Sequence, residues 1–151
     1  MALLWLASLI EHHYEHAMSP VFKRAGMRES PCSFKGGCAD YDPDHGEAHL
    51  KALDENDKAW SSGRSHLPIE HLDLTKTTIH GFEPEGDPAT VEQYVNHPGS
   101  REGPPPVAFR HRSAVHLLDG HHAAAAGIIR KDKDFPVHMV DLDHQSISKD
   151  T

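Results

Sequence analysis

The sequence predicts a mixed α/β fold: one small domain with a mixed sheet, preceded by a helical N-terminal extension. The chain has 151 residues, a length that normally folds as one domain around one modest core. Strand-like segments alternate with segments of helical periodicity from residue 66 onward, whereas the regular segments before it are helical. We therefore expect an extension over 1–65, a domain over 66–144 and a polar tail over 145–151.

Composition and charge narrow the class of protein. Hydrophobic residues make up 37% of the chain, and the apolar start "MALLWLASLI" is too short to span a bilayer and lacks the features of a secretory leader. We expect a cytoplasmic protein that does not enter a membrane. The net charge of -8 argues against binding of nucleic acid by overall electrostatic attraction, although it allows a local basic groove.

Two helices are expected in the extension. Residues 2–18 form an amphipathic helix that Ser19 and Pro20 close, and its apolar face must be covered by the rest of the chain or by a protein partner. Residues 28–43 have no periodicity and predict a loop. A second helix over 46–60 carries its large apolar residues on one side. These are Leu50, Leu53 and Trp60.

The first half of the domain contains a strand and a well-marked helix. "LPIEHLDL", from Leu67, alternates as a short strand does. In "GDPATVEQYVNHPG", Asp87 is the expected N-cap, Pro88 occupies the first turn, and His97-Pro98-Gly99 ends the helix. The loop "SREGPPP" then leads to the second half.

The second half predicts a hairpin, a helix and a last strand. "VAFRH" and "AVHLLD" are strands joined by a turn at Arg112-Ser113. An alanine-rich helix follows over 121–130, and its small side chains favour close packing. "FPVHMVDL" is the final strand, and the tail after Asp143 is polar and expected to be loose.

The junction between the hairpin and the alanine-rich helix is the candidate site. A strand that ends in Asp119-Gly120 and passes directly into a helix presents backbone N–H groups that attract anions, phosphate above all. Gly120 allows a close approach, while His121 and His122 can donate hydrogen bonds, transfer a proton or bind a metal. The alternative is an ordinary turn in which Asp119 caps the helix and both histidines are solvated.

The order of segments resembles the ParB N-terminal-like domain, the fold shared by ParB partition proteins and sulfiredoxin, over roughly residues 66–143. The resemblance rests on "LPIEHLDL", "TVEQYV", "GPPPVAF", "VHLLDGHHAAAA" and "FPVHMVDLD". It implies a phosphate site for a nucleotide or nucleic acid at Asp119, Gly120, His121 and His122. A nucleoside triphosphate with Mg²⁺ is the implied cofactor, and relatives of this size often occur in phage and mobile elements.

One residue departs from the family pattern. Many relatives have an arginine, a bidentate phosphate ligand, where this chain has Ala123. Three explanations stay open: nucleotide turnover is lost, Arg110 or Arg112 reaches the phosphate instead, or the residue was replaced to trap an inactive state. Sulfinic-acid reduction is not expected, because it needs a cysteine in this segment, where His121 and His122 stand instead. Chromosome partition is not expected, because the long helical DNA-binding region of ParB proteins is absent.

Two functions follow from the resemblance. In the first, an NTPase, phosphotransferase or small nuclease uses His121 or His122 as general acid or base, Arg110 and Arg112 neutralise charge, and Mg²⁺ bridges phosphate to Glu70 or Asp73. In the second, the domain is a non-catalytic module that binds a nucleotide or a protein, which Ala123 favours. Whether the chain is an enzyme is left undecided.

A zinc protein is a third, weaker alternative. "HHYEH" fits the inverted zinc-peptidase pattern, with His12, Glu15 and His16 as its candidate residues. Cys32 and Cys38 could form a disulfide or join His45 and His49 around zinc, but two reduced thiols in a loop are the expected state. "DYDPDHGE" lacks the spacing of a calcium-binding EF-hand.

Overall fold

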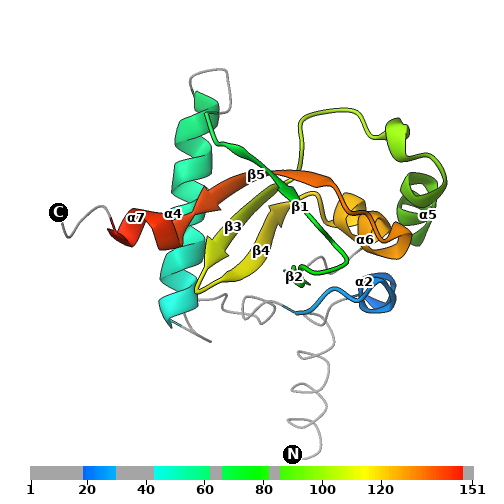
Figure 1. Ribbon diagram of the computed structural model, residues 1–151, viewed down its shortest axis with the longest axis horizontal. Helices are drawn as coiled ribbons and strands as arrows, with labels where there is room; N and C mark the ends of the chain where they lie inside the picture. Colours follow the sequence, from blue (N-terminus) through cyan, green and yellow to red (C-terminus); the bar gives the residue numbers. More distant parts are fainter. Residues whose placement is uncertain (1–18, 30–42, 62–65, 82–85, 148–151) are drawn as a thin grey trace, which may run out of the picture.

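The structure is a computed structural model, and it describes residues 19–29, 43–61, 66–81 and 86–147. Its centre is a five-stranded mixed sheet in the order β1-β5-β3-β4-β2 (Figure 1). The β1/β5 and β3/β4 pairs are antiparallel, whereas β3/β5 and β2/β4 are parallel. The predicted mixed α/β fold is confirmed. The strands are β1 (Ile69–Leu72), β2 (Ile79–His80), β3 (Val107–His111), β4 (Ala114–Asp119) and β5 (Phe135–Asp141).

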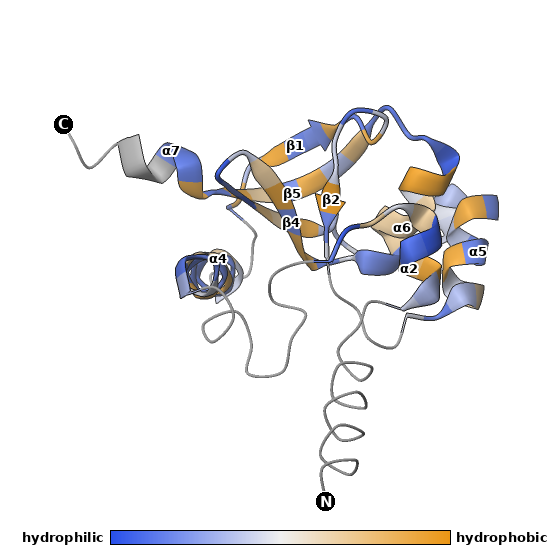
Figure 2. Cartoon of the chain, turned by 90° about the horizontal axis from the view of Figure 1, so that it is seen from below, coloured by the Kyte–Doolittle hydropathy of each residue, from blue (hydrophilic) through white to orange (hydrophobic). Residues whose placement is uncertain are grey.

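Helices cover both faces of the sheet. One face packs against α2 (Pro20–Ala25), α5 (Pro88–Asn96) and α6 (His121–Arg130), which form the larger core together with the strands. The other face packs against α4 (Pro43–Ser61) around a smaller core. Figure 2 shows the apolar strands of the sheet together with the apolar side of α6. Because the side chains of a strand alternate between the two faces, β3 contributes Ala108 to the larger core and Phe109 to the smaller one.

The elements with strong local signals form where the sequence predicts them. The carboxylate of Asp87 accepts a hydrogen bond from the Ala89 N–H at the start of α5. Arg112 and Ser113 adopt positive φ angles of 49° and 65°, which match the right-handed twist of a tight hairpin. The alanines of α6 are buried, as expected for a helix that packs closely on the sheet.

The helix expected at 46–60 forms as α4, but its orientation is unusual. The residues that face the sheet are mainly small, including Ala48, Ala52 and Ala59. The larger apolar residues Leu50 and Trp60 are exposed, Leu50 to 62% of its surface. The apolar side read from the sequence is therefore not the side that α4 buries.

Three further elements differ from the prediction or were not predicted. Helix α2 begins at Pro20, β2 contains only two residues, and α7 (Leu142–Ile147) replaces the loose tail expected after Asp143. Leu142 is buried against the smaller core, which explains why the chain stays ordered past β5. The helix predicted at 2–18, the "HHYEH" motif and both cysteines lie outside the described residues. Within the described ranges, no helix combines the length and apolarity needed to cross a membrane.

Candidate phosphate-binding site

The junction between β4 and α6 has the backbone geometry of a helix N-terminus without a side-chain cap. Gly120 is the N-cap, with φ 90° and ψ 30°, so Asp119 does not cap the helix. The Ala124 N–H donates to the Gly120 carbonyl at 3.0 Å and begins the intrahelical pattern. Helix geometry leaves the amides of His121, His122 and Ala123 without intrahelical acceptors, which makes this end favourable for an anion.

A pocket of about 250 Å³ opens at this junction. Its floor is formed by the five consecutive residues 119–123, and three side chains from the preceding helix and loop complete it. These are Tyr94, Arg101 and Glu102. We call this the junction pocket. The residues that the sequence assigns to the phosphate at this junction, 119–123, therefore line one pocket, together with an arginine that was not predicted to be there.

Both histidines of the junction pocket also make structural contacts. The Asp87 N–H donates to Nε2 of His122 at 3.0 Å. A neutral His122 in this hydrogen bond must carry its proton on Nδ1, which is then a donor. The His122 ring packs edge-on against Phe22 at 5.6 Å between centroids, and the His121 ring lies 6.3 Å from the same phenyl ring. The two imidazoles are thus held by α2 as well as by their own helix.

Arg101 joins the junction pocket to a neighbouring one. Its Nη1 donates to the Pro104 carbonyl at 2.6 Å, which fixes the guanidinium within its loop. The neighbouring pocket has a volume of about 330 Å³ and shares Tyr94, Arg101 and Ala123 with the junction pocket. We call it the adjoining pocket. Its other lining residues are Pro98, Gly103, Pro105, Pro106, Arg130, Asp132, Asp134, Phe135 and Pro136.

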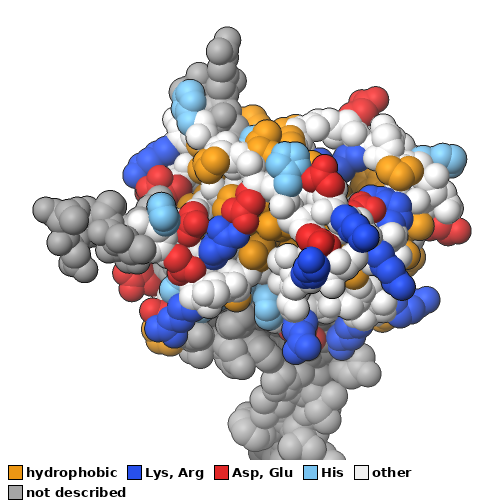
Figure 3. Space-filling model, in the orientation of Figure 1, with side chains coloured by type: hydrophobic (Ala, Val, Ile, Leu, Met, Phe, Trp, Pro, Cys, Tyr) orange, Lys and Arg blue, Asp and Glu red, His pale blue; other side chains and the backbone are white. Residues whose placement is uncertain are grey.

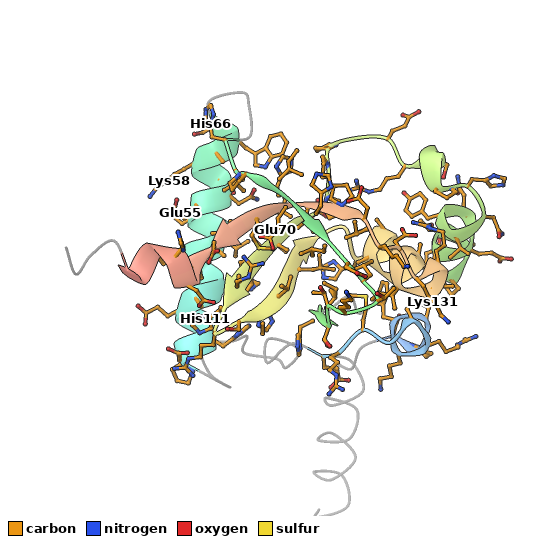
Figure 4. The ribbon with its side chains drawn as sticks, in the orientation of Figure 1. Glu55, Lys58, His66, Glu70, His111 and Lys131 are labelled. Atoms are coloured by element: carbon orange, nitrogen blue, oxygen red, sulfur yellow. The ribbon has the colours of Figure 1, made fainter. Side chains whose placement is uncertain are left out.

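The remaining predicted site residues lie together in a different place. Glu70, Asp73, Arg110 and Arg112 line a pocket of about 610 Å³ on the sheet, which we call the sheet-face pocket. It shares no residue with the junction pocket. Figure 4 shows Glu70 on β1, an edge strand of the sheet, away from the α6 helix. The structure therefore does not bring the predicted carboxylates and arginines to the predicted phosphate.

Ion pairs engage the charged groups of the sheet-face pocket. Arg110 donates to both oxygens of Glu70 and to Asp141 Oδ2, the latter at 3.1 Å. These partners, Glu70 first, raise the pKa of the Arg110 guanidinium. Arg112 pairs with Asp44 of α4 at 3.1 Å. Neither arginine is thus placed to replace the arginine missing at Ala123.

Asp73 has a local structural role. Its carboxylate accepts hydrogen bonds from the hydroxyl and the backbone N–H of Thr75. The Thr75 hydroxyl is the main cause that lowers the pKa of this carboxyl. Across the described ranges, no three His, Cys, Asp or Glu side chains are grouped so that they could hold a metal ion.

Comparison with known proteins gives a structural likeness but no match in sequence. No family model matches the chain, and no curated protein matches it. Among solved structures, sulfiredoxin from Arabidopsis thaliana is similar over 53% of this chain and 94% of that protein, with 14% sequence identity and a TM-score of 0.38. A likeness at this level assigns neither a family nor an activity, so the function must be inferred from the residues of the chain itself.

Proposed function

We propose that the chain is a nucleotide-binding module that holds the phosphates of its ligand in the junction pocket and does not turn the ligand over. The observation that carries the proposal is the composition of this pocket. It combines the first turn of α6, which has no side-chain cap, with the guanidinium of Arg101 and the imidazole of His122.

These groups form a suitable set for phosphate. The amides at the start of α6 and the dipole behind them favour negative charge. Arg101 adds a cation whose charge-assisted hydrogen bonds are about twice as strong as neutral ones. The Nδ1–H of His122, set by the bond that its Nε2 accepts from Asp87, is a further donor.

The adjoining pocket supports a nucleotide over inorganic phosphate. It lies next to the junction pocket and is lined by Tyr94, Phe135 and several prolines, which are suitable surfaces for a planar base. Arg101 lines both pockets and stands between the base and the phosphates in this arrangement.

Three observations favour binding over turnover. His121 and His122 pack on Phe22, and the side chain of Ala123 cannot bind phosphate as an arginine there would. Glu70 is paired with Arg110 outside the junction pocket.

Asp119 and Glu102 line the junction pocket and would repel a bare phosphate. The ligand would therefore bind as its Mg²⁺ complex, with the ion supplied by the nucleotide.

Calorimetric titration with MgATP, MgCTP and Mg-pyrophosphate tests this function. We expect at least one nucleotide to bind more tightly than pyrophosphate. Replacing Arg101 by alanine should weaken that binding by about tenfold or more, because a charge-assisted hydrogen bond contributes about 1.5–3 kcal/mol.

Arg112→Ala is the matched control, because this arginine is exposed and lies in the sheet-face pocket. It should leave the affinity unchanged. Equal losses in both variants would indicate nonspecific attraction and would refute the proposed site. Hydrolysis of the bound nucleotide that disappears in His122→Ala would instead establish the catalytic alternative.

A further inference from the structure

Five of the fifteen histidines gather between α4 and the sheet. The rings of His45 and His116 lie 4.4 Å apart between centroids, His80 and His116 lie 5.0 Å apart, and His45 and His111 lie 6.2 Å apart. His49 completes the group through its contact with Phe109, at 5.8 Å between centroids. We call these five residues the histidine cluster. Figure 4 shows its outermost member, His111, beside the first turns of α4.

His116 is the centre of the cluster. Its ring stacks on Phe109 with 5.0 Å between centroids, and only 6% of its surface is exposed. Its buried Nδ1 has no hydrogen-bond partner among the described residues. Burial, followed by the neighbouring histidines, lowers the pKa of His116 to about 3. Burial also lowers the pKa of His49.

Two carboxylates near the cluster, Asp44 and Asp143, already have hydrogen-bond partners. Asp44 of α4 accepts from Nε2 of His111 at 2.9 Å and pairs with Arg112. Asp143 of α7 accepts from the backbone N–H groups of Arg112 and Ser113. Glu47 and Lys51 of α4 line a pocket with Asp44 and His111 at the edge of the cluster. The carboxylates therefore lie beside His111, at the edge of the cluster, and not at its centre.

Apolar contact holds α4 on the sheet only weakly. The helix contributes small residues, Ala48 and Ala52, to the smaller core, where they meet Phe109, Val140 and Leu142. An alanine buries little apolar area, and each square ångström contributes only about 25 cal/mol. The rings of His45 and His49, which lie against Phe109 and His116, therefore add to the contact that keeps α4 in place.

We propose that the histidine cluster is a proton-operated latch, which holds α4 on the sheet at neutral pH and releases it in mildly acidic conditions. In the docked state His116 cannot take up a proton without burying a charge among neighbouring rings. Released into water, the same imidazole is protonated normally. Protons therefore bind the released state and draw α4 away from the sheet.

The sign and steepness follow from linkage. The ordinary pKa of histidine is near 6.5, and that of docked His116 is about 3, so the released state binds more protons between these two values. Docking is fully favourable above pH 6.5 and weakens as the pH falls toward 3. One such proton changes the docking equilibrium about tenfold per pH unit, and His49 adds to this change.

Hydrogen–deuterium exchange of the full chain tests the latch, with rates corrected for the intrinsic effect of pH. Between about pH 6.5 and about pH 5.5, the opening equilibrium of α4 amides should rise about fivefold or more, while β5 amides keep their protection. Unchanged protection of α4 would overturn the proposal. An equal loss in α4 and β5 would also overturn it, because the whole domain would then be unfolding.

Two variants link the response to the cluster. His116→Phe keeps an aromatic ring on Phe109 but cannot be protonated. The pH dependence of the α4 opening equilibrium should therefore lose the contribution of one proton, which is about tenfold per pH unit. If this variant does not fold, His49→Phe on α4 serves the same purpose with a smaller expected reduction. His97→Gln, at an exposed histidine after α5, is the control and should leave the response unchanged. A full response in the cluster variant that folds would refute the latch.

Discussion

Replacing Phe22 by alanine is expected to lower the free energy of unfolding by about 3–5 kcal/mol, as loss of a fully buried aromatic ring normally does. The Phe22 side chain has no exposed surface. It lies between the backbone at Gly86 and the rings of His121 and His122, so two separate segments meet on it. These segments cannot both move inward at once, and the substitution should leave a cavity.

Urea unfolding of Phe22→Ala and of a matched control measures this effect. Ile129→Ala removes a comparable apolar side chain that is 45% exposed on α6, and it should cost about 1 kcal/mol or less. Similar losses in the two variants would contradict the central place of Phe22 in the core. At a temperature where Phe22→Ala stays folded, it should also bind nucleotide more weakly, because both imidazoles of the junction pocket rest on this ring.

The sequence predicts the elements whose causes are local. The N-cap at Asp87, the hairpin turn at Arg112 and the glycine at the start of α6 act within a few residues, and each is found where expected. Strand β2 has no such signal. Its two residues become a strand because they pair with β4 in parallel and because Arg28 bridges to His80 from the other side. Pairing between distant segments is not visible in a local pattern.

Helix α4 shows a second limit. Its periodicity correctly indicates a helix, but the helix carries two apolar sides, one of large residues and one of alanines with His45. A hydrophobicity pattern favours the larger residues for the core. The structure buries the side of small residues, because His45 packs close to Phe109 and His116 there. What the sequence cannot show is which of the two sides fits the available space.

The sequence predicts the backbone of the candidate site but not the cation beside it. The five residues 119–123 are contiguous in the sequence, and they line one pocket. The arginines were misplaced because register decides where they lie. Val107 pairs with Asp119, whereas Arg110 pairs with Val115, about 10 Å further along a strand that rises about 3.3 Å per residue. Arg101 lies in an irregular loop, and the sequence has no periodic pattern there that would predict where the loop runs.

Gly120→Ala is expected to lower the free energy of unfolding by about 2–5 kcal/mol, from two causes that act together. Its φ of 90° lies in the left-handed region, where a residue with a Cβ pays about 1–2 kcal/mol. The added Cβ would also lie 2.5 Å from Cβ of Pro106, and overpacking of this kind costs about 1–3 kcal/mol. Urea unfolding measures the sum.

Gly26→Ala separates the two causes. Gly26 has a similar φ of 85°, but an added Cβ would meet nothing closer than Ile128 Cγ2 at 3.9 Å, so only the backbone penalty of about 1–2 kcal/mol is expected. The excess loss in Gly120→Ala then measures the contact with Pro106. Because relief of that contact must shift either Pro106 or the first turn of α6, the same variant should lose nucleotide affinity while Gly26→Ala keeps it. Equal stability and equal affinity in the two variants would mean that the loop before β3 moves away from the added Cβ at no cost. The close approach of Pro106 to Gly120 would then not determine the shape of the junction pocket.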